Sequence, residues 1–179
     1  MSRARVVHTS GLGPAEIAEI RSLMHAAFDG DFGDEDLEHG LGGIHALVRD
    51  PGDDALIAHG SVVMRRMLHG GRALRCGYVE AVAVRADRRR AGLGGLVMDE
   101  LEAVIRGAYD LGALGASDDG EALYLARGWQ RWRGTTSVVA PDGLRRCPEE
   151  EGSVFVLPVE APLDLDADIA CDWRDGDVW

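Results

Sequence analysis

The sequence of 179 residues contains no lysine and no asparagine, so all 19 of its basic residues are arginine. The first absence excludes Schiff-base catalysis by a lysine amine and the lysine of a P-loop. The second excludes N-glycosylation and a Cys/His/Asn catalytic triad. No apolar run approaches the roughly 18 residues of a membrane span, and the first residues lack the apolar centre of a signal peptide. We therefore expect a cytoplasmic protein that does not act at a membrane.

Patterns for disulfides and metal sites are also missing. The cysteines are odd in number, far apart and without C-x-x-C spacing; they are Cys76, Cys147 and Cys171. This pattern predicts buried free thiols and no bound metal. The histidines at positions 39, 45, 59 and 69 have no metal-ligand spacing with these cysteines, so we interpret His39, His45, His59 and His69 as structural or surface residues.

The net charge narrows the class of partner. The chain has 31 acidic residues against its 19 arginines, a formal charge of −12. Such a balance argues against binding to nucleic acid or to an anionic lipid surface and favours a cationic small molecule. At roughly 150 residues per domain, the length predicts a single domain over residues 1–179. An apolar fraction of 46% is enough to build its core.

Hydrophobic periodicity predicts an α/β fold. Alternation of apolar and polar residues predicts strands within residues 4–9, 45–50, 55–69, 72–86, 111–117, 129–141 and 152–159. Helical spacing predicts helices within residues 10–28, 29–43, 88–110 and 118–128. Short turns join the three strands between residues 45 and 86, so we expect them to form an antiparallel meander. The order of elements predicts a mixed, mostly antiparallel, twisted sheet with helices on both faces.

A turn rich in arginine and glycine stands between the strand that ends near Val84 and the long helix. Its residues, Arg89, Arg90, Ala91, Gly92, Leu93 and Gly94, match the pattern R-x-x-G-x-G. Backbone N–H groups at such a turn, together with the helix dipole, favour a pyrophosphate, and glycines leave room for it. A P-loop would need a lysine, and a dinucleotide motif is expected in an opening βαβ unit. A solvated arginine turn before an ordinary helix remains an alternative.

Two further residues draw attention by their context. Glu80 is a carboxylate inside the otherwise apolar strand GYVEAVAV, where a charge needs a reason, although Glu80 could also face outward on an alternating strand. About thirty residues after the turn, the segment GEALYLARGW places Tyr124 in a helix that ends at Gly128.

Together, the turn and the Tyr124 segment resemble the acetyl-CoA-binding core of the GCN5-related N-acetyltransferase (GNAT) superfamily. The resemblance implies the GNAT fold, with acetyl-CoA in the cleft where two central strands separate, and no metal. It implies that main-chain groups of Val82 and Val84 pair with the pantetheine arm. The pyrophosphate would be held by Arg89, Arg90, Ala91, Gly92, Leu93, Gly94 and Gly95.

The same resemblance assigns catalytic roles to three residues. Glu80 would be the general base and would act on the substrate amine through ordered water. Tyr124 would protonate the departing CoA thiolate. The backbone N–H of Val82 would donate a hydrogen bond to the thioester oxygen as negative charge develops.

Segments outside this core resemble the aminoglycoside 2'-N-acetyltransferases of actinobacteria. They are AAFDGDFGDEDLEHGLGGIHAL, RALRCGYVEAVAVRAD, RGAYDLGAL, SVFVLPV and the ending CDWRDGDVW. The resemblance implies direct acetyl transfer to the 2'-amine of a polycationic aminoglycoside, hence antibiotic resistance, and a homodimer. It marks as substrate-binding residues Asp31, Asp36, Glu80, Glu150, Asp177 and Trp179, the last through its terminal carboxylate.

Other functions remain open from the sequence. The same chemistry could serve another amine or a hydroxyl, such as that of a cell-wall sugar or a small metabolite. A non-catalytic acyl-CoA-binding module, with an acidic face for a partner protein, is a second alternative. Acidic clusters also occur simply as solvated surface. The loop at residues 116–121 is least like the family and could affect substrate preference.

Overall fold

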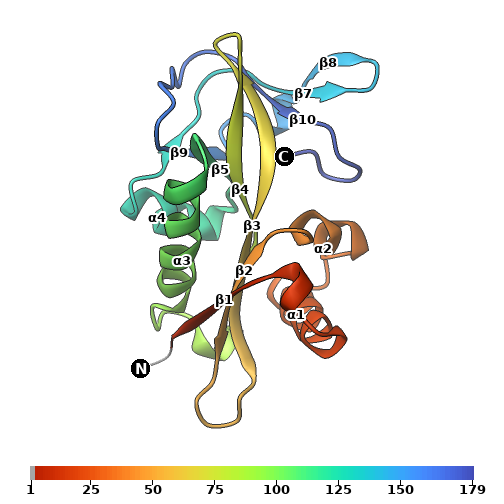
Figure 1. Ribbon diagram of the computed structural model, residues 1–179, viewed down its shortest axis with the longest axis vertical. Coiled ribbons are helices and arrows are strands. Elements are labelled where there is room, and N and C mark those ends of the chain that lie inside the picture. The colour runs from red at the N-terminus through yellow and green to blue at the C-terminus, as the bar shows by residue number, and fades with distance from the viewer. Residues whose placement is uncertain (1–2) are drawn as a thin grey trace. The chain divides into compact units, whose positions relative to one another are not determined.

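The computed structural model describes residues 3–179, and within this range ten strands and four α-helices follow one another along the chain (Figure 1). The α-helices are α1 (Pro14–Ala27), α2 (Asp34–Gly40), α3 (Leu93–Ala108) and α4 (Asp118–Ala126). The strands are β1 (Ala4–His8), β2 (Ile44–Arg49), β3 (Leu56–His69), β4 (Arg72–Val84), β5 (Leu111–Gly115), β6 (Gln130–Arg131), β7 (Thr136–Ala140), β8 (Gly143–Arg146), β9 (Val154–Pro158) and β10 (Ile169–Asp172). Three 3₁₀ turns are η1 (Thr9–Gly11), η2 (Ala86–Arg88) and η3 (Pro148–Glu150).

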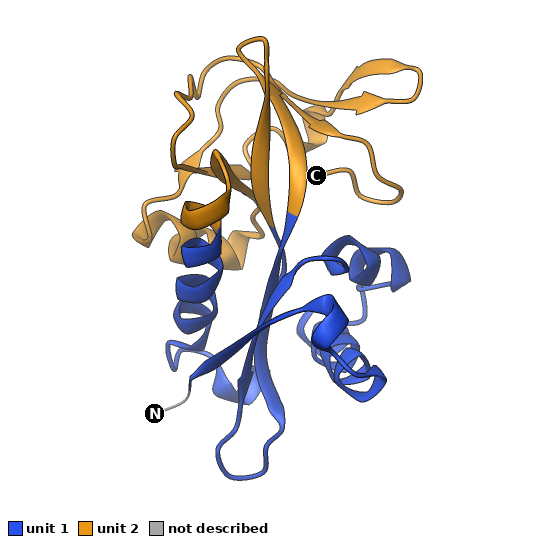
Figure 2. Cartoon of the chain, in the orientation of Figure 1, with its two compact units in different colours: residues 1–63, 79–104 blue, residues 64–78, 105–179 orange. Residues whose placement is uncertain are grey.

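The described chain divides into two compact units, coloured separately in Figure 2. Unit 1 consists of the chain up to Val63 together with Val79–Val104. Unit 2 consists of Met64–Tyr78 and Ile105–Trp179. The boundaries fall within β3, β4 and α3, so each of these three elements has residues in both units.

Unit 1 is built on strands β1, β2 and β3, which pair antiparallel in that order. Helices α1 and α2 bury one face each, and the side chains of Ile20, Met24 and Leu37 pack with Leu47 of β2 in a common core. Burial of a side chain of this kind contributes about 1.5–3 kcal/mol, so these contacts rather than helix propensity hold the short helix α2 in place.

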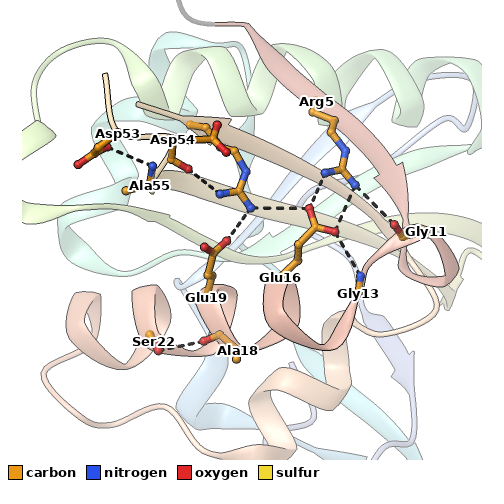
Figure 3. A network of polar contacts seen from close by, with 11 residues as sticks. Arg5, Gly11, Gly13, Glu16, Ala18, Glu19, Ser22, Asp53, Asp54 and Ala55 are labelled. Carbon is orange, nitrogen blue, oxygen red and sulfur yellow. Dashed lines mark hydrogen bonds and ion pairs between the residues drawn. The ribbon is translucent and has the colours of Figure 1, made fainter. Parts of the chain in front are cut away.

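Ion pairs attach α1 to its neighbours in unit 1 (Figure 3). Arg49 of β2 donates to Glu19 at 2.6 Å, and Arg5 of β1 pairs with Glu16. Glu16 also accepts from the backbone N–H of Gly13 at 3.2 Å and so closes the first turn of the helix. The hydrogen bond from the Arg5 guanidinium is the main reason why the pKa of Glu16 is lowered.

Unit 2 contains a mixed sheet with the strand order β6-β9-β5-β4-β3-β10-β7-β8. Strand β4 pairs in parallel with β5 through Cys76, Gly77 and Tyr78 and then continues to Val84. Strand β10 lies between β3 and β7 and pairs antiparallel with the first and parallel with the second. The core of this unit contains Trp129 and Trp132, both 1% exposed.

Most of the predicted elements are present, including the predicted meander, in which β2 pairs antiparallel with β3 and β3 is hydrogen-bonded to β4. The single strand predicted over residues 129–141 is wrong, because the chain breaks into β6 and β7. At the break, the N–H groups of Arg133 and Gly134 both donate to the carbonyl of Leu165 at 2.9 Å, and Gly134 leaves no room for a side chain beside Ala167. Strands β8 and β10 were not predicted, since neither has an alternating pattern.

The three cysteines are free and buried, as the sequence predicts. In the part of the chain that the structure describes, no helix has the combination of length and apolar character that crossing a membrane requires. The same residues include no cluster of three or more His, Cys, Asp or Glu side chains arranged to hold a metal ion.

Candidate active site

The candidate general base lies next to an irregular residue of β4, Ala81, and we call this irregularity the bulge. Ala81 has a φ of 52°, a left-handed conformation that costs a residue with a Cβ atom roughly 1–2 kcal/mol. The side chains here do not alternate: Val79 is buried, residues 80–82 are all half-buried, and Ala83 is buried again. Glu80 is therefore not simply the outward residue of a regularly alternating strand.

Two side chains of β3 bind the main chain of the bulge. Ser61 Oγ donates to the carbonyl of Glu80 at 3.3 Å, and the Nδ1 atom of His59 lies 3.0 Å from the carbonyl of Ala81. Both Ser61 and His59 are at most 1% exposed. The backbone conformation next to Glu80 and Val82 is thus supported by tertiary contacts rather than by local preference.

The predicted pyrophosphate turn has the backbone of an anion site. Arg90 and Gly92 both have positive φ values, 61° and 78°, and a Cβ atom at Gly92 would meet nothing within 4 Å. The first helical hydrogen bond runs from Leu96 N–H to the Gly92 carbonyl at 3.0 Å. The N–H groups of residues 93–95 therefore precede this bond and remain available to an anion at the positive end of α3. The residues present fit a pyrophosphate.

The arginines of this turn differ in their surroundings. Arg88 pairs with Asp50 at 2.5 Å, so its charge is partly balanced within the protein. Arg89 and Arg90 are exposed at the start of α3. The local positive charge that the sequence predicts here is therefore supplied mainly by Arg89 and Arg90.

Close packing fixes the direction of α3 within unit 1. A Cβ atom at Gly60 of β3 would lie 2.7 Å from Val97 of α3 and 3.1 Å from Val82 of β4. Glycine is therefore needed here for the helix to approach the sheet, and this approach also holds the Val82 side chain in place.

In unit 2, the predicted acid Tyr124 lies on α4 and is 7% exposed. Its ring contacts those of Trp129 and Phe155, and Gly120 passes so close that an added Cβ atom would lie 3.0 Å from the Tyr124 ring. Burial raises the pKa of Tyr124 to about 12. The phenol therefore carries its proton throughout the neutral range, which is the state that a proton donor needs.

Three of the predicted substrate-binding residues converge in unit 2. The buried Trp179 is 4% exposed, and its backbone N–H donates to Asp177 Oδ1 at 3.3 Å. Burial is the main cause that raises the pKa of Glu150, and the negative charge of Asp177 raises it further. The chain end is thus ordered, and it brings a ring and several carboxylates together.

One residue that the sequence did not indicate holds this tail. Arg174 donates to the carbonyl oxygen of Asp177 at 2.6 Å and to Trp179 O at 3.0 Å. Cys171 Sγ adds a contact of 3.2 Å to the carbonyl of Val178. The only feature of the sequence that could have indicated this role is that Arg174 is the single basic residue in the acidic segment CDWRDGDVW.

The remaining predicted acids, Asp31 and Asp36, belong to unit 1. Asp31 is exposed in the connection between α1 and α2. Asp36 accepts from the N–H of Gly33 at 2.7 Å, which caps the first turn of α2. One of its oxygens therefore already has a structural role.

Comparisons with known proteins bear on the family and the fold of the chain. No model of a known protein family matches the chain. The chain is 56% identical over 180 residues to an aminoglycoside 2'-N-acetyltransferase of Mycolicibacterium fortuitum, a match that covers 98% of this chain and 91% of that protein. Its fold is similar to that of a GNAT family acetyltransferase of Brucella melitensis in complex with acetyl-CoA, with a TM-score of 0.62, 17% identity and 97% of each chain covered. A GNAT family N-acetyltransferase of Escherichia coli in complex with CoA has a TM-score of 0.63 and 18% identity, with 95% of this chain and 90% of that chain covered. The predicted GNAT fold is confirmed.

Proposed function

The chain belongs to the aminoglycoside 2'-N-acetyltransferases, and from this membership we propose how its own residues carry out the reaction. The enzyme transfers the acetyl group of acetyl-CoA to the 2'-amine of an aminoglycoside. The nitrogen forms a bond to the thioester carbonyl carbon, the C–S bond breaks, and the CoA thiolate takes up a proton. The amine becomes a neutral amide, and the loss of its positive charge would weaken binding to an anionic target and so confer resistance. The observation that carries this proposal is the near full-length likeness to the Mycolicibacterium fortuitum enzyme, which does not favour the two alternatives.

Acetyl-CoA would be bound by the main chain of unit 1. The N–H groups of residues 93–95 and the guanidinium groups of Arg89 and Arg90 would take the pyrophosphate, with Ala91 and Gly92 forming the turn between them. Main-chain groups of Val82 and Val84 would pair with the pantetheine arm. When bound, acetyl-CoA supplies an activated acyl group.

Three groups would act on the reacting atoms. The 2'-amine arrives protonated and must lose a proton before it can attack, and Glu80 would accept this proton through ordered water. The N–H of Val82 would donate to the developing oxyanion. Tyr124, which is protonated in the neutral range, would donate to the thiolate. A thiolate leaving into the same apolar surroundings is poorly solvated, so its affinity for a proton also rises.

Acidic residues would hold the polycationic substrate. The candidates are Asp31, Asp36, Glu80, Glu150, Asp177 and the terminal carboxylate of Trp179. Arg174 donates to the main-chain oxygens of Asp177 and Trp179 and so would hold both residues toward an ammonium group. The raised pKa of Glu150 reflects burial and neighbouring negative charge, and an ammonium group beside it would lower the pKa again.

The setting of the enzyme is also part of the proposal. Residues 1–179 would form a single acetyltransferase domain, and it would act in the cytoplasm, where acetyl-CoA is made and used. We expect no metal ion, nucleic acid or membrane to take part. A homodimer is supported by one exposed sheet face of unit 2, on which the strand register places Met64, Leu68, Val139 and Leu144 together. Light scattering coupled to gel filtration would measure the mass.

A matched pair of substrates tests the function. Kanamycin B and kanamycin A differ only at the 2' position, where the first carries an amine and the second a hydroxyl. Release of the CoA thiol should be fast with kanamycin B and near background with kanamycin A, and mass spectrometry should find one added acetyl group. Equal turnover of both would place the transfer on another group. Turnover of neither, by a folded protein that binds CoA, would contradict the proposed function.

A further inference from the structure

A buried chain of hydrogen bonds runs through unit 1 to the bulge of β4. The side chains of His45 and His59 are each 1% exposed, and His45 Nδ1 lies 3.0 Å from His59 Nε2. At one end, Thr9 Oγ1 lies 2.8 Å from His45 Nε2. At the other end, His59 Nδ1 lies 3.0 Å from the carbonyl oxygen of Ala81. The four residues come from widely separated parts of the sequence.

The final carbonyl fixes the direction of every bond in this chain. A carbonyl oxygen can only accept, so His59 carries its proton on Nδ1 and accepts on Nε2. His45 must then carry its proton on Nδ1, and its Nε2, at 2.8 Å, is the nearer of two acceptors for the Thr9 hydroxyl, the other being the carbonyl of Gly43 at 3.2 Å. Thr9 in turn accepts from the N–H of Gly42 at 2.9 Å. Both imidazoles are neutral, in agreement with burial that lowers the pKa of His45 to about 4 and that of His59 to about 3.

The hydrogen bond from His59 also determines where an amide points. The carbonyl of Ala81 and the N–H of Val82 belong to the same planar peptide unit, and the described chain has no cis peptide bond. In a trans peptide, the C=O and N–H bonds point in opposite directions. Because His59 holds the carbonyl, the N–H of Val82 points away from His59 and from β3.

The conformation that allows this arrangement is not one that Ala81 prefers. Its φ of 52° must be held by the surroundings, and the described contacts that do so are those of His59 and Ser61. Without them, the peptide could relax toward the ordinary extended conformation of a strand. That change would rotate the N–H of Val82 and displace the carboxylate of Glu80.

We propose, building on the proposed function, that His59, supported by His45 and Thr9, is a positioning residue for acetyl transfer. It fixes the peptide between Ala81 and Val82 so that the Val82 amide faces the developing oxyanion. It does not relay a proton, because the row of hydrogen bonds ends at the Ala81 carbonyl, which cannot transfer a proton further. Its effect therefore falls mainly on kcat, because the pyrophosphate turn and the acidic residues other than Glu80 do not depend on this peptide.

The test compares two variants of His59. His59→Leu removes the donor, and the kcat for kanamycin B should fall roughly 10-fold to 100-fold, the effect of misplacing a reacting group by about 1 Å. The KM values for acetyl-CoA and kanamycin B should stay within about threefold. His59→Asn retains an N–H at the position of Nδ1, so it should recover most of the lost kcat although it cannot bond to His45.

His69 provides a matched control in unit 2. It is 8% exposed, its Nδ1 lies 2.9 Å from the carbonyl of Asp168, and its Nε2 accepts from the N–H of Asp164 at 3.1 Å. His69→Leu therefore removes a buried imidazole that has two main-chain contacts, neither of which involves the bulge. Its kcat should stay within about twofold of the parent even if its melting temperature falls as far as that of His59→Leu.

A second substitution tests the bulge directly. Ala81→Gly removes the cost of the positive φ, so the bulge no longer depends on His59 to the same extent. In the Ala81→Gly background, the fold-decrease in kcat caused by His59→Leu should be at least about threefold smaller than in the parent. A general loss of stability would not produce this difference.

Defined results would overturn the inference. They are a folded His59→Leu enzyme with parental kcat, a His69→Leu enzyme that loses as much kcat, or a His59→Asn enzyme that loses as much as His59→Leu. If His59→Leu does not fold, His59→Gln, which has no donor at the position of Nδ1, replaces it, and parental kcat in that variant has the same meaning. Failure of the parent to acetylate kanamycin B would instead contradict the proposed function.

Discussion

The buried histidine pair makes the stability of the enzyme depend on pH in a calculable way. Burial is the main cause that lowers the pKa of His45 to about 4 and that of His59 to about 3, from an ordinary value of 6.5. As the pH falls below 6.5, the two histidines therefore bind protons in the unfolded chain but not in the folded chain. The stability that the neutral pair contributes is fully present above 6.5 and is lost as the pH falls toward the folded values.

The size of this loss follows from the same values. Between pH 7.5 and pH 5.5, each histidine lowers the free energy of unfolding by about 1.4 kcal/mol, and the pair lowers it by about 2.7 kcal/mol. Because both folded pKa values lie well below 5.5, the result depends mainly on the unfolded value. For a chain of this length, the melting temperature should fall by roughly 5–10 °C. Carboxylates with lowered pKa values, such as Glu16 and Asp110, titrate below this window.

Urea unfolding at the two pH values measures the effect. For each protein, we take the difference between the unfolding free energies at pH 7.5 and pH 5.5. In the double variant His45→Gln/His59→Gln, this difference should be about 2.7 kcal/mol smaller than in the parent. A loss of stability that is the same at both pH values does not affect it. Glu150, whose raised pKa acts in the opposite direction, contributes equally to parent and variant and cancels. His25→Gln, at an exposed position, is the control and should retain the parental difference. A folded double variant with the parental pH dependence would refute the reasoning.

Three further substitutions test the proposed site. Glu80→Gln removes the proton acceptor at nearly constant volume, so kcat should fall roughly 100-fold or more while CoA affinity stays constant; parental turnover with an unchanged pH profile would contradict the role. Gly92→Val places a branched side chain at a φ of 78°, so calorimetry should find CoA binding at least about tenfold weaker in a folded variant, and unchanged affinity would mean that the pyrophosphate binds elsewhere. Asp177→Asn should raise the KM for kanamycin B severalfold without changing the melting temperature, whereas the matched exposed Asp142→Asn should leave KM unchanged; equal KM values would remove Asp177 from the site.

The parts of the site that could be predicted are those encoded locally. The pattern R-x-x-G-x-G predicts the turn before α3, because positive φ at Gly92 and free N–H groups at a helix start depend on adjacent residues. The strands β2, β3 and β4 follow from alternation, and the long helix α3 follows from its apolar spacing. The buried state of the cysteines follows from their residue type and their lack of pairing.

Features that depend on distant partners could not be predicted in this way. Strand β10 has only four residues, Ile169–Asp172, and it is a strand because β3 and β7 flank it on both sides. The break between β6 and β7 depends on the carbonyl of Leu165, which lies thirty residues further along the chain. Arg174 binds the tail through main-chain oxygens, and no sequence pattern marks such oxygens.

The bulge at Ala81 is the most consequential of these features. The segment GYVEAVAV is apolar except for Glu80 and has the composition of an ordinary strand, and alanine has no preference for a left-handed conformation. The information that creates the bulge lies instead in β3, where His59 and Ser61 are the polar residues of the fully buried stretch 56–63. A buried imidazole requires hydrogen-bond partners. The carbonyl of a residue with an irregular strand conformation can serve as such a partner. The orientation of the Val82 amide, which we propose faces the developing oxyanion, is therefore encoded by the side chains of a neighbouring strand rather than by the strand that carries it.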